Sequence, residues 1–87
     1  MSETHASHAD IVKRLKRASG HLNKVISMIE EQSPCLDVAQ QLHAVANALS
    51  NAKTAFVQDH IQYCIDGTHH GDANEAVREL KEITKYL

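Results

Sequence analysis

Two long segments of this 87-residue chain carry apolar residues at alternating intervals of four and three. In the first segment these residues are Ile11, Leu15, Ala18, Leu22, Val25 and Ile29, and in the second they are Val38, Leu42, Val45, Leu49, Ala52 and Phe56. This spacing places an apolar line on one face of an α-helix, in the heptad pattern by which helices pack side by side. The chain is therefore predicted to be all-α, with two long helices that pack along their lengths.

Residues that cap or break helices set the expected boundaries. Asp10 precedes the first apolar line and is expected to cap that helix, which leaves residues 1–9 as a flexible arm. Ser33 and Pro34 separate the two long helices, and no further breaker occurs before Gly67. The second helix should therefore run for about 30 residues, or about 45 Å. A polar loop leads to a short third helix, whose apolar face is formed by Ala76, Val77, Leu80, Ile83 and Leu87.

A chain of this size is expected to form one domain, spanning residues 1–87, with a thin core. Such a domain buries only roughly 60–65% of the surface of its unfolded chain. One short helix cannot cover the seam of two long ones, so we expect two protomers to pair as an antiparallel four-helix bundle. Gly20 lies within the first helical segment, where glycine lowers helix stability by about 1 kcal/mol relative to alanine. Its presence there predicts close packing or a close approach of another part of the structure.

The composition narrows the class of protein. No segment approaches the ~20 apolar residues that span a bilayer, and the N-terminus is polar, so we expect no membrane partner and a cytoplasmic location. Cysteines stay reduced there, which favours metal or redox chemistry over a structural disulfide. Nothing resembles a nucleophile paired with a base in a cleft, so the protein is not expected to be an enzyme.

The charged residues are unevenly distributed. The formal net charge is −2, but five of the nine basic residues fall between positions 12 and 25, where no acidic residue occurs. They are Lys13, Arg14, Lys16, Arg17 and Lys24. Such a basic patch attracts the negatively charged phosphate backbone of a nucleic acid.

Three side chains form a candidate metal site. His60 and Cys64 are four residues apart and share one helix face, whereas Cys35 lies 25 residues before His60, or about 37 Å away along a helix. One chain cannot bring the three together, but two antiparallel copies can. Two thiolates and an imidazole favour Cu(I), Zn(II) or, less readily, Ni(II). The competing interpretation is that the cysteines are ordinary apolar residues. His21 and His43 are expected on the helix surface.

A series of motifs runs through the predicted helices. They are Arg14-Leu15-Lys16, Gly20-His21-Leu22, Cys35-Leu36-Asp37-Val38, Gln41-Leu42-His43-Ala44-Val45, Asp59-His60-Ile61-Gln62-Tyr63-Cys64 and Ala76-Val77-Arg78-Glu79-Leu80. Together they resemble the copper-sensing operon repressor (CsoR) family, whose relatives sense nickel or cobalt, formaldehyde or persulfide. The resemblance covers about residues 9 to 87.

The resemblance implies a three-helix protomer, an antiparallel dimer and a homotetramer built as a dimer of dimers. It implies that the metal-free form binds operator DNA and represses efflux or resistance genes, and that Cu(I) releases the DNA. The ligand positions of the family fall on Cys35, His60 and Cys64, and Glu79 matches a carboxylate that supports the site. The basic surface of the first two helices implies DNA contacts, which we assign to Lys13, Arg14, Lys16, Arg17 and Lys53.

Three alternatives to a copper sensor stay open. One is a metal chaperone or store with no role at DNA. A nickel-sensing branch of the family adds an N-terminal histidine, which His5 could supply here. A persulfide- or thiol-responsive repressor would use the two cysteines without needing His60. The sequence also departs from the pattern of copper sensors and of DNA contacts, since Pro34, Ser19 and Asn51 replace a tyrosine, an arginine and a basic residue.

Overall fold

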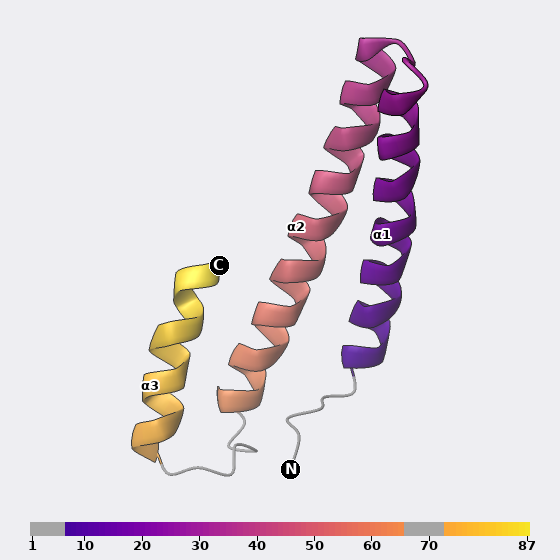
Figure 1. The fold of residues 1–87 in the computed structure, drawn as a ribbon. Coiled ribbons are helices and arrows are strands. Elements are labelled where there is room, and N and C mark those ends of the chain that lie inside the picture. Colours follow the sequence, from indigo (N-terminus) through magenta and orange to yellow (C-terminus); the bar gives the residue numbers. More distant parts are fainter. Residues whose placement is uncertain (1–6, 66–72) are drawn as a thin grey trace.

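The computed structural model describes residues 7–65 and 73–87, with the side chains of Cys64 and Ile65 outside the description. Three α-helices and a short 3₁₀ helix account for nearly all of this part of the chain: α1 (His8–Glu30), α2 (Cys35–Ile65), α3 (Ala73–Ile83) and η1 (Thr84–Tyr86). Helices α1 and α2 run antiparallel from a tight turn, and α3 lies beside the C-terminal half of α2 (Figure 1). The predicted all-α fold, with two long helices and a short one, is confirmed.

The first helix begins earlier than the sequence suggested. It starts at His8, so His8 and Ala9 belong to the helix and not to the arm expected over residues 1–9. The expectation that Asp10 caps the helix is wrong, because Asp10 lies within the first turn and Ser7 takes the N-cap position. Asp10 instead pairs with Arg14 one turn later, at 3.0 Å between Oδ2 and Nε.

The turn between the long helices is a Schellman motif. The amide of Ser33 donates to the carbonyl of Met28, and the amide of Gln32 donates to that of Ile29. Gln32 adopts a positive φ of 59°, the left-handed conformation in which this motif ends a helix. Pro34 follows directly, and α2 begins at the next residue. This turn fixes the start of α2 against the end of α1.

Within a single chain, only about half of the residues in each apolar line are buried. Every seventh residue is buried between α1 and α2: Ile11, Ala18 and Val25 on α1, and Val45 and Ala52 on α2. These side chains are small or medium in size, so the two helices approach closely. The interface between the two antiparallel helices is therefore closely packed but narrow.

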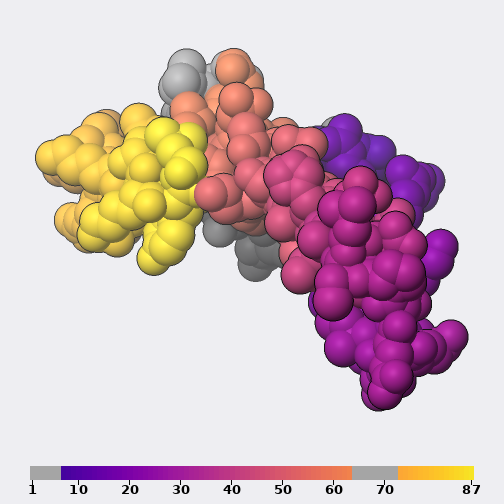
Figure 2. Space-filling model, turned by 90° about the horizontal axis from the view of Figure 1, so that it is seen from above, coloured from indigo at the N-terminus to yellow at the C-terminus, as the bar shows by residue number. Residues whose placement is uncertain are grey.

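The other half of each line is exposed. Leu15, Leu22 and Ile29 of α1 and Leu42, Leu49 and Phe56 of α2 are all exposed large apolar residues. We call these six residues the apolar face. The chain measures 54 × 22 × 15 Å with a radius of gyration of 17.3 Å, against about 12 Å for a compact domain of this length. Figure 2 shows the reason, since α3 lies to the side of α2 away from α1.

Two further expectations concern local packing and the membrane. A Cβ atom at Gly20 would meet nothing within 4 Å among residues 7–65 and 73–87, so these parts of the chain do not provide the close packing predicted there. In the part of the chain that is described, no helix combines the length and the apolarity that crossing a membrane takes.

Candidate metal centre

The three predicted ligands all lie on α2. Cys35 is its first residue, and His60 and Cys64 lie in its last two turns. The helix is continuous over its 31 residues, so about 37 Å separates Cys35 from His60 along the axis. Among the described side chains, no three histidine, cysteine, aspartate or glutamate residues come together as a metal site. A site that uses Cys35 and His60 together therefore needs two chains.

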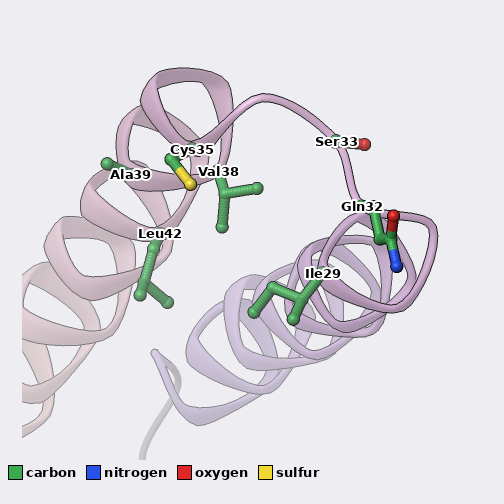
Figure 3. A pocket seen from close by; sticks show the side chains of 7 residues that line it. All are labelled: Ile29, Gln32, Ser33, Cys35, Val38, Ala39 and Leu42. Atoms are coloured by element: carbon green, nitrogen blue, oxygen red, sulfur yellow. The ribbon is translucent and has the colours of Figure 1, made fainter.

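Cys35 lies at an open apolar hollow beside the turn. Its thiol is free and its side chain is exposed. The hollow has a volume of about 520 Å³ and lies between the ends of α1 and α2. Figure 3 shows Ile29 of α1 and Val38 and Leu42 of α2 around this hollow, with the sulfur of Cys35 beside Val38. A partner side chain can reach the sulfur without displacing any part of this chain.

His60 is the one buried polar residue among the described side chains, with 8% of its surface exposed. Its Nε2 lies 3.1 Å from Oε1 of Glu79, which α3 carries. A carboxylate at this position favours the tautomer in which Nε2 carries the hydrogen. The ring of Tyr63 lies 6.1 Å from that of His60, at a tilt of 33°.

His8, which the sequence placed in the flexible arm, lies in the first turn of α1 and reaches the same end of the molecule. Its ring stacks on Phe56 at 5.2 Å, and its Nε2 lies 3.9 Å from Oδ2 of Asp59. His8, His60 and Glu79 line one pocket of about 330 Å³, together with Phe56, Glu82, Ile83 and Tyr86. The signal was available, because the next interval of three before Ile11 falls on residue 8. His5, the histidine predicted as an extra ligand, lies outside the described residues.

The predicted DNA contacts are spread around the two long helices. Arg14 and Arg17 line a groove of about 270 Å³ between α1 and α2, with Ala18, His21, Ala48 and Asn51. Lys13 and Lys16 are exposed on α1 outside this groove. Asn51 and Lys53 flank the buried Ala52, and successive helical residues are rotated by about 100°. Lys53 therefore lies on the opposite side of α2 from the groove.

His21 differs from the expected surface histidine. It is half-buried, and its Nε2 lies 2.7 Å from Oε1 of Gln41. This hydrogen bond joins the middle of α1 to α2 and orients the ring at the edge of the groove.

Comparison with known proteins assigns this chain to one family. Residues 7–86 match the family described as metal-sensitive transcriptional repressors. The chain is 33% identical over 76 residues to the copper-sensing transcriptional repressor CsoR of Bacillus subtilis (strain 168), covering 86% of this chain and 75% of that protein. It is 34% identical over 76 residues to CsoR of Mycobacterium ulcerans (strain Agy99), covering 86% of this chain and 65% of that protein.

A solved structure agrees with these relatives. The nickel-responsive transcriptional regulator InrS superposes with a TM-score of 0.78 and 31% identity, over 100% of both chains. The protein therefore belongs to the metal-sensitive transcriptional repressors, the CsoR family. This family acts on transcription, so the expectation that the chain is not an enzyme is confirmed.

Proposed function

We propose that this protein is a copper-responsive repressor in which the metal-free form binds operator DNA and Cu(I) releases it, opening metal efflux or resistance genes. The site would combine Cys35 of one protomer with His60 and Cys64 of a second. The observation that carries this proposal is the continuity of α2, which holds Cys35 and His60 near opposite ends of one unbroken helix.

The apolar face suggests how two copies meet. On α2 it follows a seven-residue interval through Leu42, Leu49 and Phe56. The same interval extended backwards reaches Cys35, and one further turn beyond Phe56 reaches His60. The ligands thus stand at the two ends of the exposed line. Antiparallel pairing of two copies over this line brings Cys35 of each beside the His60–Cys64 end of the other.

Pairing of two copies would also bury the apolar face, which is exposed in the single chain. Leu49 is 43% exposed and Phe56 42% exposed in the single chain. Each apolar side chain that becomes fully buried contributes up to about 1.5–3 kcal/mol. The midpoint between Cys35 and Cys64 falls between Leu49 and Ser50. Of these two residues Leu49 belongs to the apolar face, so the two-fold axis of such a dimer passes close to Leu49.

The donor set supports Cu(I) as the metal. Two thiolates are soft ligands, and three protein ligands suit the low coordination numbers of Cu(I). The relatives in Bacillus and Mycobacterium are copper-sensing repressors by name.

A nickel-responsive repressor is the second candidate. His8 lines the same pocket as His60 and offers a further imidazole nitrogen, and the structural neighbour InrS is a nickel-responsive regulator. Zn(II) also accepts this mixed donor set.

The contact between His60 and Glu79 offers a route from the metal to the rest of the molecule. A metal held by His60 would polarise the ring and strengthen its contact with the carboxylate of Glu79. Glu79 lies on α3, so metal binding would fix α3 against the end of α2. A coupling of about 1–3 kcal/mol between the metal and DNA sites is typical of such systems, and it acts equally in both directions.

Titration of Cu(I) into the reduced protein bound to DNA from upstream of its own gene tests the proposal. Fluorescence anisotropy of the labelled DNA should fall as Cu(I) is added to the wild-type protein. His60→Ala should keep DNA binding and lose the response. His43→Ala, which alters an exposed histidine on the same helix, should respond as the wild type does.

Three outcomes separate the candidates. DNA affinity that stays unchanged with Cu(I) and with Ni(II) would refute a metal-responsive repressor. Release by Ni(II) alone, abolished by His8→Ala, would favour the nickel candidate. Release of His60→Ala by a polysulfide donor would favour a thiol-responsive repressor that works through Cys35 and Cys64.

A further inference from the structure

The groove between α1 and α2 lies on the side of the helix pair opposite the apolar face. Taking the buried Ala18 as the reference, Arg14 falls about 40° to one side and Leu15 about 60° to the other, at about 100° per residue. His21 lies on the side of Arg14, and Leu22 lies on the side of Leu15. A second copy that covers the apolar face therefore leaves the groove open.

The lining of the groove is suited to an anion. Arg14, Arg17 and His21 come from α1, and Asn51 comes from α2. These side chains offer hydrogen-bond donors, and none of the described residues that line the groove is acidic. Ala18 and Ala48 complete the lining, and their small side chains leave a volume of about 270 Å³ between the longer ones. Arginine is the side chain best matched to the paired oxygens of a phosphate group.

Two intramolecular contacts hold this lining in place. Gln41 orients the ring of His21 through the 2.7 Å contact between its Oε1 and Nε2 of the ring. In the imidazolium form of the ring, Nδ1–H is a second donor that an anion can use. Asp10 holds Arg14 from one turn earlier through the 3.0 Å contact at Nε. The side chains of Arg14 and Asp10 are 50% and 64% exposed, so water competes for both and the pair is easily exchanged. The carboxylate of Asp10 occupies a donor that a phosphate oxygen would otherwise use.

We propose that this groove is the seat for one phosphate of the DNA backbone, in which His21 and Asn51 act beside Arg14 and Arg17, and that Asp10 is a built-in competitor which the phosphate displaces. The proposal rests on the proposed DNA-binding function and adds two contact residues and one opposing residue to it. Asp10 lowers DNA affinity, because Arg14 must exchange one anion for another.

Measurement of DNA affinity over a range of salt concentrations tests the roles of the charged residues. Asp10→Asn should tighten DNA binding about two- to five-fold at low salt, since it frees Arg14. Asp37→Asn removes the same charge from an exposed site in the first turn of α2, and it should have a smaller effect. Arg17→Ala should weaken binding and reduce the slope of log K against log salt by about 0.9, the value for one phosphate contact.

The histidine ring signals in an NMR spectrum test the seat directly. Unlabelled DNA should shift the ring signals of His21 and leave those of the exposed His43 in place. Inorganic phosphate should shift the same His21 signals at much higher concentration, which separates a free anion from a DNA phosphate as the source. His21→Ala should weaken DNA binding, because it removes the Nδ1–H donor that the imidazolium ring offers to the phosphate.

The outcomes distinguish this proposal from the function on which it rests. If the wild-type protein binds DNA while Asp10→Asn matches Asp37→Asn and the His21 signals stay fixed, the phosphate seat is refuted and the repressor function stands. If the protein binds no DNA while phosphate shifts the His21 signals, the repressor function fails, and with it the assignment of the phosphate to DNA.

Discussion

Two variants that each lack part of the metal site should restore metal binding when they are combined. Cys35→Ala removes the thiolate at the start of α2, and His60→Ala removes the imidazole near its end. About 37 Å of continuous helix separates these positions, so one chain cannot contain the whole site. A protein refolded from both variants can contain it, because one chain supplies Cys35 and the other supplies His60 and Cys64.

The size of the recovery follows from symmetry. A two-fold dimer of one chain of each kind holds one complete site and one site that lacks both altered groups. Random exchange makes roughly half of all dimers mixed, so about one quarter of the wild-type capacity should return. If the site lay within one chain, or between chains paired in parallel, mixing the two variants would restore no Cu(I) binding.

Competition for Cu(I) against a chromophoric chelator measures this capacity. The two variants are unfolded together under reducing conditions, refolded and titrated, and each variant is treated alone in the same way. Cys35→Ala refolded with a chain carrying both substitutions serves as the control, since no pair of those chains contains a complete site. Mixed dimers that form but bind no more Cu(I) than this control would refute the intersubunit site.

Four other changes test the assembly, the turn, the first helix and the link to α3. Leu49→Glu should weaken self-association about 30-fold, because each copy loses about 1 kcal/mol of burial at the two-fold axis; analytical ultracentrifugation measures it. Gln32→Gly should stabilise the fold by about 0.5–1 kcal/mol in chemical denaturation, because its φ of 59° suits glycine. Gly20→Ala should add about 1 kcal/mol, because a Cβ there meets nothing within 4 Å. Glu79→Gln should lower Cu(I) affinity about 10- to 100-fold and reduce DNA release, since the carboxylate orients His60.

Neighbouring residues provide controls for two of these changes. Ser50→Glu adds the same charge one residue after Leu49, on an exposed face away from the apolar one, and should leave the association unchanged. Glu31→Gly places glycine at a φ of −88°, where the added backbone freedom should destabilise the fold. Equal effects at Leu49 and Ser50, or at Gln32 and Glu31, would contradict the geometry on which the predictions rest. A loss of stability in Gly20→Ala would show that another chain approaches this residue.

The periodicity of the sequence determined the helical fold. Intervals of four and three between apolar residues are sufficient to define two long helices, and the absence of a breaker between Pro34 and Gly67 is sufficient to make the second one continuous. Continuity alone separates Cys35 from His60. The most consequential feature of the candidate site, that one chain cannot complete it, was therefore available from the sequence, because the rise of an α-helix per residue is fixed.

Only the tertiary structure decided which half of each apolar line faces the other helix. Both halves are apolar, so periodicity does not distinguish them, whereas packing does. Close approach of α1 and α2 requires small side chains, and Ala18, Val45 and Ala52 meet that requirement. The larger leucines are left on the apolar face.

The polar contacts between helices were equally inaccessible from the sequence. The stacking of His8 on Phe56, the hydrogen bond from His21 to Gln41 and the contact of His60 with Glu79 join residues far apart in the chain. Spacing along one helix places a residue on a face, but it does not say which side chain of another helix lies opposite. That depends on the axial register of the two helices, which the turn at Gln32 and the packing of the buried residues set together.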